Sequence, residues 1–87
     1  MTGTKKILKD PLLQRDYDLL ALLKQHEEGL TMRDIFILLE TSDYLVVRYR
    51  LRKLGTFGLL KWSWLDGEKR FYITRKGVRF LSEAVRT

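Results

Sequence analysis

The sequence contains no cysteine, and only one proline and one histidine among its 87 residues. Without cysteine, a disulfide framework and a thiolate zinc site are both excluded. No apolar run approaches the roughly 20 residues that a transmembrane helix needs, and the polar start MTGTKK does not resemble a signal peptide. We therefore expect a cytoplasmic protein without a membrane partner.

Signals of catalysis are also missing. His26, the single histidine, stands beside Glu27 and Glu28 at the polar end of a predicted helix, where an exposed structural side chain is the simplest interpretation. No cluster of potential ligands has metal-site spacing, and no glycine-rich loop follows a strand to hold a nucleotide. Acid–base or nucleophilic catalysis needs a base held near a nucleophile in a pocket. We therefore expect no enzyme activity, no metal and no cofactor.

Acidic residues are scarce in the second half of the chain. Residues 1–43 contain six Lys/Arg and eight Asp/Glu, whereas residues 44–87 contain eleven Lys/Arg and three Asp/Glu. The formal net charge of +6 is thus concentrated after residue 43. A basic excess in one part of a chain is typical of a protein that binds a polyanion, although many small basic proteins carry such charge only for solubility.

The N-terminal part predicts an arm and a helix. Residues 1–10 show little periodicity and are expected to form a flexible basic arm. Asp10 followed by Pro11 is typical of a helix start, because the carboxylate can cap the helix and proline suits its first position. The leucine-rich segment that follows predicts a helix over about 11–27, which Gly29 is placed to end in a left-handed cap.

Two further helices are predicted close together. Thr31 and Asp34 have the spacing of a capping box, with Asp in place of the usual Glu, and they precede a short, nearly all-apolar helix. Ser42 or Asp43 then caps a third helix over about 43–57. Two short helices joined by about four residues form a helix-turn-helix candidate.

After the third helix the apolar period changes to two. Leu60, Trp62 and Trp64 alternate with polar residues, which predicts a strand. Asp66-Gly67 is the preferred dipeptide of a two-residue type I′ hairpin turn. Pairing across this turn sets Leu65 opposite Glu68, Trp64 opposite Lys69, Trp62 opposite Phe71 and Leu60 opposite Ile73, so that Leu60, Trp62, Phe71 and Ile73 share a face that can pack on the helices.

A last helix is predicted from the cap residue Thr74 through Val85. The order helix, helix, helix, hairpin, helix predicts an α+β fold. It is the order of a winged helix-turn-helix: three helices, then a β-hairpin wing over 59–73 and a C-terminal helix. Residues 11–87 are expected to form this single winged-helix domain.

The third helix has an apolar side and a basic side. At 100° per residue, its core-facing stripe is formed by Tyr44, Val47, Leu51 and Leu54. The opposite side carries Leu45, Val46, Tyr49, Arg52 and Lys53, with Arg48 and Arg50 flanking the stripe.

The basic side lacks the acids that usually accompany exposed lysine and arginine on a helix. Asp43 is the only acid, and it lies at the N-terminus, where the helix dipole favours it. Like charges without compensation cost stability. We therefore expect a partner to supply the anions.

Arginine interleaved with apolar and aromatic residues suits the major groove of double-stranded DNA. Arginine can donate to guanine O6 and N7, and apolar atoms can meet the thymine methyl group. Lys69 and Arg70 near the hairpin tip could reach backbone phosphates or the minor groove. The candidate DNA-binding residues are Ser42, Leu45, Val46, Arg48, Tyr49, Arg50, Arg52, Lys53, Lys69 and Arg70.

Other roles stay open for the apolar members of this set. Leu45, Val46 and Tyr49 could instead be buried against the N-terminal arm or another subunit. Trp62 is expected in the core, and Trp64, nearer the hairpin tip, in an interface.

Three segments occur in an order typical of one fold. DIFILLETS (34–42) has the pattern of a helix and turn, VVRYRLRKLGTFGLLKW (46–62) that of a helix leading into a hairpin, and FYITRKGVRFL (71–81) that of a strand leading into a helix. Together they resemble the winged-helix transcriptional regulators of the MarR and PadR types and their small archaeal and viral relatives. In particular, the Tyr-x-Leu-Thr-x-x-Gly motif of these families is matched by Tyr72, Ile73, Thr74 and Gly77.

The resemblance implies a sequence-specific regulator of transcription that binds double-stranded DNA in association with the nucleoid. It also implies a homodimer through the first helix and residues 75–86, which would bind a palindromic site. Two alternatives remain. The chain could be a protein-interaction module that uses Leu45, Val46, Tyr49 and Trp64, or a non-specific chromatin or RNA binder.

Overall fold

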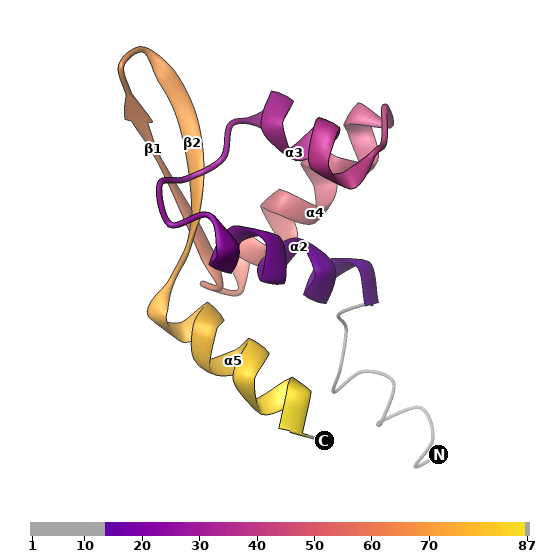
Figure 1. Ribbon diagram of the computed structural model, residues 1–87, viewed down its shortest axis with the longest axis vertical. Helices are drawn as coiled ribbons and strands as arrows, with labels where there is room; N and C mark the ends of the chain where they lie inside the picture. Colours follow the sequence, from indigo (N-terminus) through magenta and orange to yellow (C-terminus); the bar gives the residue numbers. More distant parts are fainter. Residues whose placement is uncertain (1–13, 87) are drawn as a thin grey trace.

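The computed structural model describes residues 14–86. Its element order confirms the predicted α+β winged helix-turn-helix, with the hairpin between the helix-turn-helix and the closing helix (Figure 1). The predicted arm, 1–10, and the predicted helix start lie outside the described residues. The elements are α2 (Gln14–Gln25), α3 (Met32–Leu39), α4 (Tyr44–Thr56), β1 (Leu60–Leu65), β2 (Glu68–Ile73) and α5 (Arg75–Arg86).

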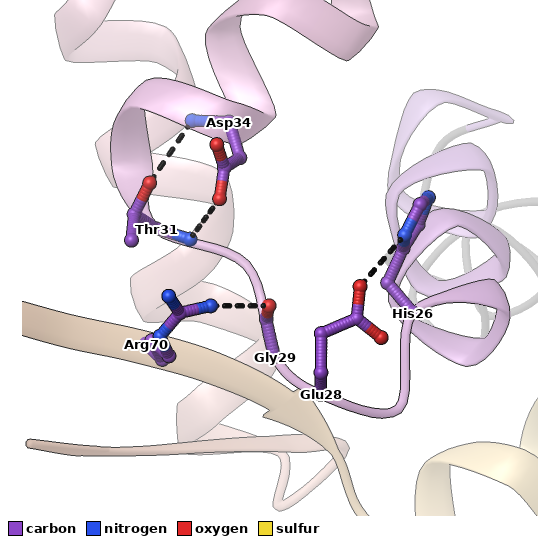
Figure 2. Close-up of polar contacts among 6 residues, drawn as sticks. All are labelled: His26, Glu28, Gly29, Thr31, Asp34 and Arg70. Atoms are coloured by element: carbon purple, nitrogen blue, oxygen red, sulfur yellow. Dashed lines mark hydrogen bonds and ion pairs between the residues drawn. The ribbon is translucent and has the colours of Figure 1, made fainter. Parts of the chain in front are cut away.

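Side-chain caps set the starts of α3 and α4. Thr31 Oγ1 accepts a hydrogen bond from the Asp34 N–H at 3.1 Å, and the Asp34 carboxylate accepts one from the Thr31 N–H at 3.1 Å, as Figure 2 shows. This is the predicted capping box. The Asp43 carboxylate accepts from the Val46 N–H at 3.2 Å, so Asp43 rather than Ser42 is the N-cap of α4.

The hairpin has the predicted turn and register. Asp66 and Gly67 have positive φ angles of 53° and 81°, which a type I′ turn requires at both positions. The chain before α3 adds a further pairing, since Leu30 and Phe71 exchange backbone hydrogen bonds of 3.0 and 2.8 Å. This bridge holds the hairpin against the start of the helix-turn-helix. The observed pairs include Leu60–Ile73, Trp62–Phe71, Trp64–Lys69 and Leu65–Glu68, as predicted.

The core lies where the helices meet the base of the hairpin. Tyr17 on α2 stacks on Phe80 of α5 with ring centroids 5.7 Å apart, which joins the first and last described helices. Figure 1 shows the hairpin tip extending away from α2 and α5. The buried apolar residues are Leu19, Leu20, Leu23, Leu30, Ile35, Val47, Leu51, Leu54, Leu59, Leu60, Phe71 and Leu81.

Two aromatic residues expected in the core are half exposed instead. Trp62 is 50% exposed although its neighbours on the same face, Leu60 and Phe71, are each 5% exposed. The reason is lateral: Phe71, its partner across the strands, is paired on its other side with Leu30, whereas Trp62 lies on β1 and lines the open cleft beside α4. Tyr44, in the first turn of α4, is 47% exposed and packs edge-to-face on Phe36.

The junction between the hairpin and α5 is tightly packed. Thr74 Oγ1 accepts from the Gly77 N–H at 3.0 Å and donates to the Gly58 carbonyl at 2.7 Å, which confirms Thr74 as the cap. A Cβ placed on Gly77 would lie 2.2 Å from the Leu59 carbonyl oxygen. Only glycine permits this approach of α5 to the chain that leads into β1.

Candidate nucleic-acid interface

The outer side of α4 is basic and apolar at once. Arg48 and Arg52 are exposed. Two apolar or aromatic neighbours on this side are exposed as well, Leu45 at 72% and Tyr49 at 63%. Val46 is also exposed, at 37%. The helix itself contains no acidic residue. Long cationic side chains and apolar atoms are therefore presented together on one accessible surface.

The other two cations of α4 face inward. Arg50 Nη1 lies 3.1 Å from one carboxylate oxygen of Asp16, and Lys53 Nζ lies 2.7 Å from the other. The Asp16 side chain is fully buried, and those of Arg50 and Lys53 are only 13% and 15% exposed. A buried carboxylate needs such partners, because an unpaired charge in the interior is costly. The expectation that the cations of α4 lack an acidic partner is therefore wrong for these two residues.

The cations thus divide between two sides of the helix. At 100° per residue, Arg48 and Arg52 project about 40° apart, and Arg50 and Lys53 about 60° apart. The mean directions of the two pairs differ by about 150°. We call Arg48 and Arg52 the outer pair, and Arg50 and Lys53 the inner pair.

A cleft of about 890 Å³ separates α4 from the hairpin. Among the described residues that line it, four are cationic, the outer pair from α4 and Lys61 and Lys69 from the strands, and none carries a carboxylate. Tyr44, Trp62 and Phe71 add aromatic surface. The cleft can therefore attract an anion and also contact the apolar parts of a ligand.

Lys69 and Arg70 point to opposite faces of the hairpin, because neighbouring side chains alternate along a strand. Lys69 Nζ lies 4.1 Å from the centroid of the Trp62 ring, a cation–π contact on the cleft side. Arg70 instead donates from Nη1 to the Gly29 carbonyl at 3.1 Å (Figure 2), and its Nη2 lies 3.5 Å from Glu68. Arg70 therefore ties the hairpin to the loop before α3.

The single histidine takes part in a surface contact. His26 Nδ1 lies 3.3 Å from a carboxylate oxygen of Glu28 (Figure 2). Two contacts lower the pKa of Glu28: the larger effect comes from a hydrogen bond donated by its backbone N–H, and the smaller from the contact with His26.

Within residues 14–86, no three potential ligand side chains gather as they would around a metal ion. None of the described helices combines the length and apolar character needed to cross a bilayer.

Comparison with known proteins gives matches among solved structures only: no family model matches the chain, and neither does any curated protein. The chain is similar to Staphylococcus aureus MepR in a MepR–DNA complex, with 22% identity over 97% of this chain and 70% of that chain and a TM-score of 0.80. The fold is the winged helix-turn-helix of MarR-family regulators.

Two further neighbours have the same fold. A mutant form of S. aureus MepR is 21% identical over 94% of this chain, with a TM-score of 0.80. A MarR-family transcriptional regulator from Rhodococcus sp. RHA1 is 22% identical over 94% of this chain, with a TM-score of 0.79. The chain spans 62% and 59% of these two structures, less than two thirds of either.

In winged-helix terms, α3 and α4 form the helix-turn-helix and the β1–β2 hairpin forms the wing. The structure places Ser42, exposed, in the turn before α4. The outer pair and Lys69 line one cleft. The inner pair and Arg70 lie away from that cleft, where each has a partner within the protein.

Sequence reasoning missed two residues of this site. Asp16 lies three, four and seven residues before Leu19, Leu20 and Leu23, so its place on the apolar face of a helix was a usable signal of a buried acid. Lys61 gave no such signal. Its alternation with tryptophan indicated only an exposed strand residue, and the cleft depends on how the wing lies against α4.

Proposed function

We propose that this chain is a sequence-specific regulator of transcription that binds double-stranded DNA through α4. The observation that carries the proposal is the exposed outer pair of arginines at a cleft whose described lining residues include four cations and no carboxylate. The winged-helix fold supports it, as does the presence of DNA in the MepR complex of similar fold. Such a role would place the protein with the nucleoid.

In the proposed complex, α4 lies in the major groove, which is wide enough to admit a helix. The outer pair donates to guanine edges or phosphates, and Leu45, Val46 and Tyr49 contact thymine methyl groups and sugar. Ser42 lies at the N-terminal end of α4, where a helix can approach the backbone.

The second part of this proposal concerns the wing. Lys69, with support from Lys61 at the border of the cleft, contacts the sugar–phosphate backbone next to the groove. We assign Arg50, Lys53 and Arg70 to holding the interface in place, because each already has a partner within the protein.

We further propose a homodimer through α2 and α5, acting on a palindromic site. In a two-fold dimer the two recognition helices would lie about 34–36 Å apart, one turn of DNA. The stacked pair of Tyr17 and Phe80 supports a joint role of these helices, because it makes α2 and α5 one packed unit.

The proposal is tested by titrating a labelled duplex with the protein at several salt concentrations and following fluorescence anisotropy. We expect log K to fall linearly with log salt, with a slope of about 0.9 per phosphate neutralised. Unlabelled single strand should compete poorly. A duplex enriched from a randomised pool should bind roughly 10³-fold or more tighter than random duplex. Equal affinity for all duplexes would reject sequence-specific binding.

One observation favours a second function. Leu45, Tyr49 and Trp64 are each more than 60% exposed, which also suits a protein-interaction module. That alternative predicts weak, salt-labile DNA binding without a preferred sequence. It also predicts that Val46→Glu abolishes binding of a protein partner while DNA binding persists.

A further inference from the structure

The buried ion cluster of Asp16, Arg50 and Lys53 is not explained by contact with DNA. One carboxylate of α2 holds two cations of α4 that are three residues apart, one on each oxygen, at 3.1 and 2.7 Å. The Asp16 side chain is 0% exposed. The cluster therefore connects the recognition helix to the helix that precedes the helix-turn-helix.

We propose that Asp16 is a positioning residue, which sets the rotation of α4 about its axis and thereby the base contacts of the outer pair, Arg48 and Arg52. The inference rests on the proposed function and deepens it. It assigns the four cations of α4 to two tasks: the outer pair contacts DNA, and the inner pair holds the helix.

Two anchor points constrain a helix more than one does. A single ion pair would let α4 pivot about the contact, whereas cations on successive turns, bound by opposite oxygens of one carboxylate, fix both its rotation and its axial position. The outer pair projects from nearly the opposite side of the helix. A rotation of roughly 10° moves an atom about 6 Å from the axis by about 1 Å, and a recognition site tolerates only about 0.5 Å.

The α2 helix is a suitable reference for this anchor. Leu19, Leu20 and Leu23, on the same face as Asp16, are fully buried. Tyr17, the next residue, stacks on Phe80 of α5 with nearly parallel rings. Asp16 is therefore attached to a helix that is itself packed on two sides.

Stability alone is a poor explanation for the cluster. Buried ion groups lose their hydration, and their replacement by apolar residues of similar volume is often neutral or stabilising. A buried polar group can instead select one arrangement among several apolar packings of similar energy. Rotation of α4 is such an arrangement, because an apolar stripe is tolerant of small angular shifts.

The test compares wild type with an apolar triple variant, Asp16→Leu, Arg50→Leu and Lys53→Met. Each is titrated by fluorescence anisotropy onto a duplex selected with the wild-type protein and onto a random-sequence duplex, over a range of salt. Circular dichroism and thermal melting establish that the variant is folded. Arg48→Met with Arg52→Met is the matched control for removal of the outer cations.

We expect the triple variant to keep the salt slope of wild type on random duplex, because the inner pair contacts no phosphate. Its preference for the selected duplex should fall by roughly 10-fold or more, the scale of one missing base-pair interaction. The control should lower the salt slope by about 0.9 for each phosphate that is no longer neutralised. That combination supports the positioning role.

Either of two other results overturns it. An unchanged preference in the folded triple variant would show that packing alone sets the angle of α4. A salt slope reduced as in the control would show that Arg50 or Lys53 contacts phosphate directly. If wild type itself binds no duplex, the proposed function fails and this inference fails with it. That result differs from the two above, in which wild type binds and only the comparison with the variant fails.

Lys53→Met is the second variant, in case the triple variant does not fold. It leaves the neutral pair of Asp16 and Arg50 in place and removes one anchor. We expect a folded protein with the salt slope of wild type and a several-fold weaker preference for the selected duplex. A folded Lys53→Met protein with full preference would contradict two-point anchoring.

Discussion

Arg48 and Arg52 are the exposed arginines of α4, and their guanidinium groups are chemically able to donate two parallel hydrogen bonds to guanine. Lysine at the same position would supply only a point charge. At the scale of single residues, these two side chains are the part of the proposed interface that can distinguish bases. Lys61 and Lys69 across the cleft can supply attraction without such discrimination.

Arg52→Ala is expected to weaken binding to the selected duplex by about 1–3 kcal/mol and to relax the preference at one base pair of each half-site. Anisotropy titration of single-base variants of the site measures both effects. Arg33→Ala, at an exposed arginine of α3, is the control and should leave the preference unchanged. Equal losses for both variants would indicate a general charge effect rather than base recognition.

Gly77→Ala is expected to destabilise the fold by about 1–3 kcal/mol, because the new methyl group would meet a backbone carbonyl that cannot move aside easily. Without a shift of the chain, the methyl carbon would lie 2.2 Å from the Leu59 oxygen. Thermal melting at fixed protein concentration should show a Tm lowered by about 4–8 °C per kcal/mol.

Gly55→Ala is the matched control for this prediction. A Cβ there would lie 3.8 Å from Leu60, an ordinary contact. Since alanine favours a helix interior over glycine, we expect a gain of up to about 1 kcal/mol. A Gly77→Ala protein as stable as Gly55→Ala would contradict the packing described for α5 and the start of β1.

At the scale of elements, α4 depends on contacts of two kinds. Its N-terminus is held by the local cap Asp43, and its side is held by Asp16, a residue 34 positions before Arg50. The cap is a stability feature that acts within one turn, whereas the distant contact governs where the helix lies. The two can therefore be altered independently.

Asp43→Ala is expected to lower the free energy of unfolding by about 0.5–2 kcal/mol, because the Val46 N–H loses its acceptor and the helix dipole loses a favourable charge. Chemical denaturation monitored by circular dichroism measures the change. Ser42→Ala, one residue earlier, should have little effect on stability. A larger loss for Ser42→Ala would mean that the cap had been assigned to the wrong residue.

At the scale of the whole molecule, the fold brings the basic segments of the chain together. The basic second half of the sequence contributes α4 and the wing, and these elements border one cleft. The α2 and α5 helices pack on each other away from the hairpin tip (Figure 1). This separation leaves one part of the molecule for the proposed contact with DNA and another for the proposed second copy.

The proposed homodimer predicts that binding depends on the spacing between the two half-sites. Sedimentation should show two chains per selected duplex, and insertion of about five base pairs between the half-sites should greatly weaken binding, because it turns one half-site to the opposite side of the duplex. Substitution of the same central bases without a change in length is the control. One chain per duplex, with no effect of the insertion, would exclude the proposed arrangement.

Much of this fold could be predicted from short stretches of sequence. The capping box at Thr31 and Asp34, the Asp66-Gly67 turn and the strand register each depend on atoms within a few residues of one another. The alternation of side chains then follows from the register. Even so, alternation alone placed Trp62 in the core, whereas the structure leaves it half exposed, because it lies on β1 beside the open cleft while its partner Phe71 is also paired with Leu30.

The sequence by itself determined the element order, the caps at Thr31 and Thr74, the hairpin turn and the excess of cations in α4 and the wing, because local hydrogen bonding and periodicity carry that information. It left Ser42 and Asp43 both open as the cap of α4, and it placed the end of the first helix at Gly29, whereas α2 ends at Gln25. Only the tertiary structure decided which of those cations are available. Asp16 reaches Arg50 and Lys53, and Gly29 reaches Arg70, across 34 to 41 residues of chain. Such contacts depend on how whole elements pack, since a long side chain can turn to either side of its helix or strand to reach a buried charge or carbonyl.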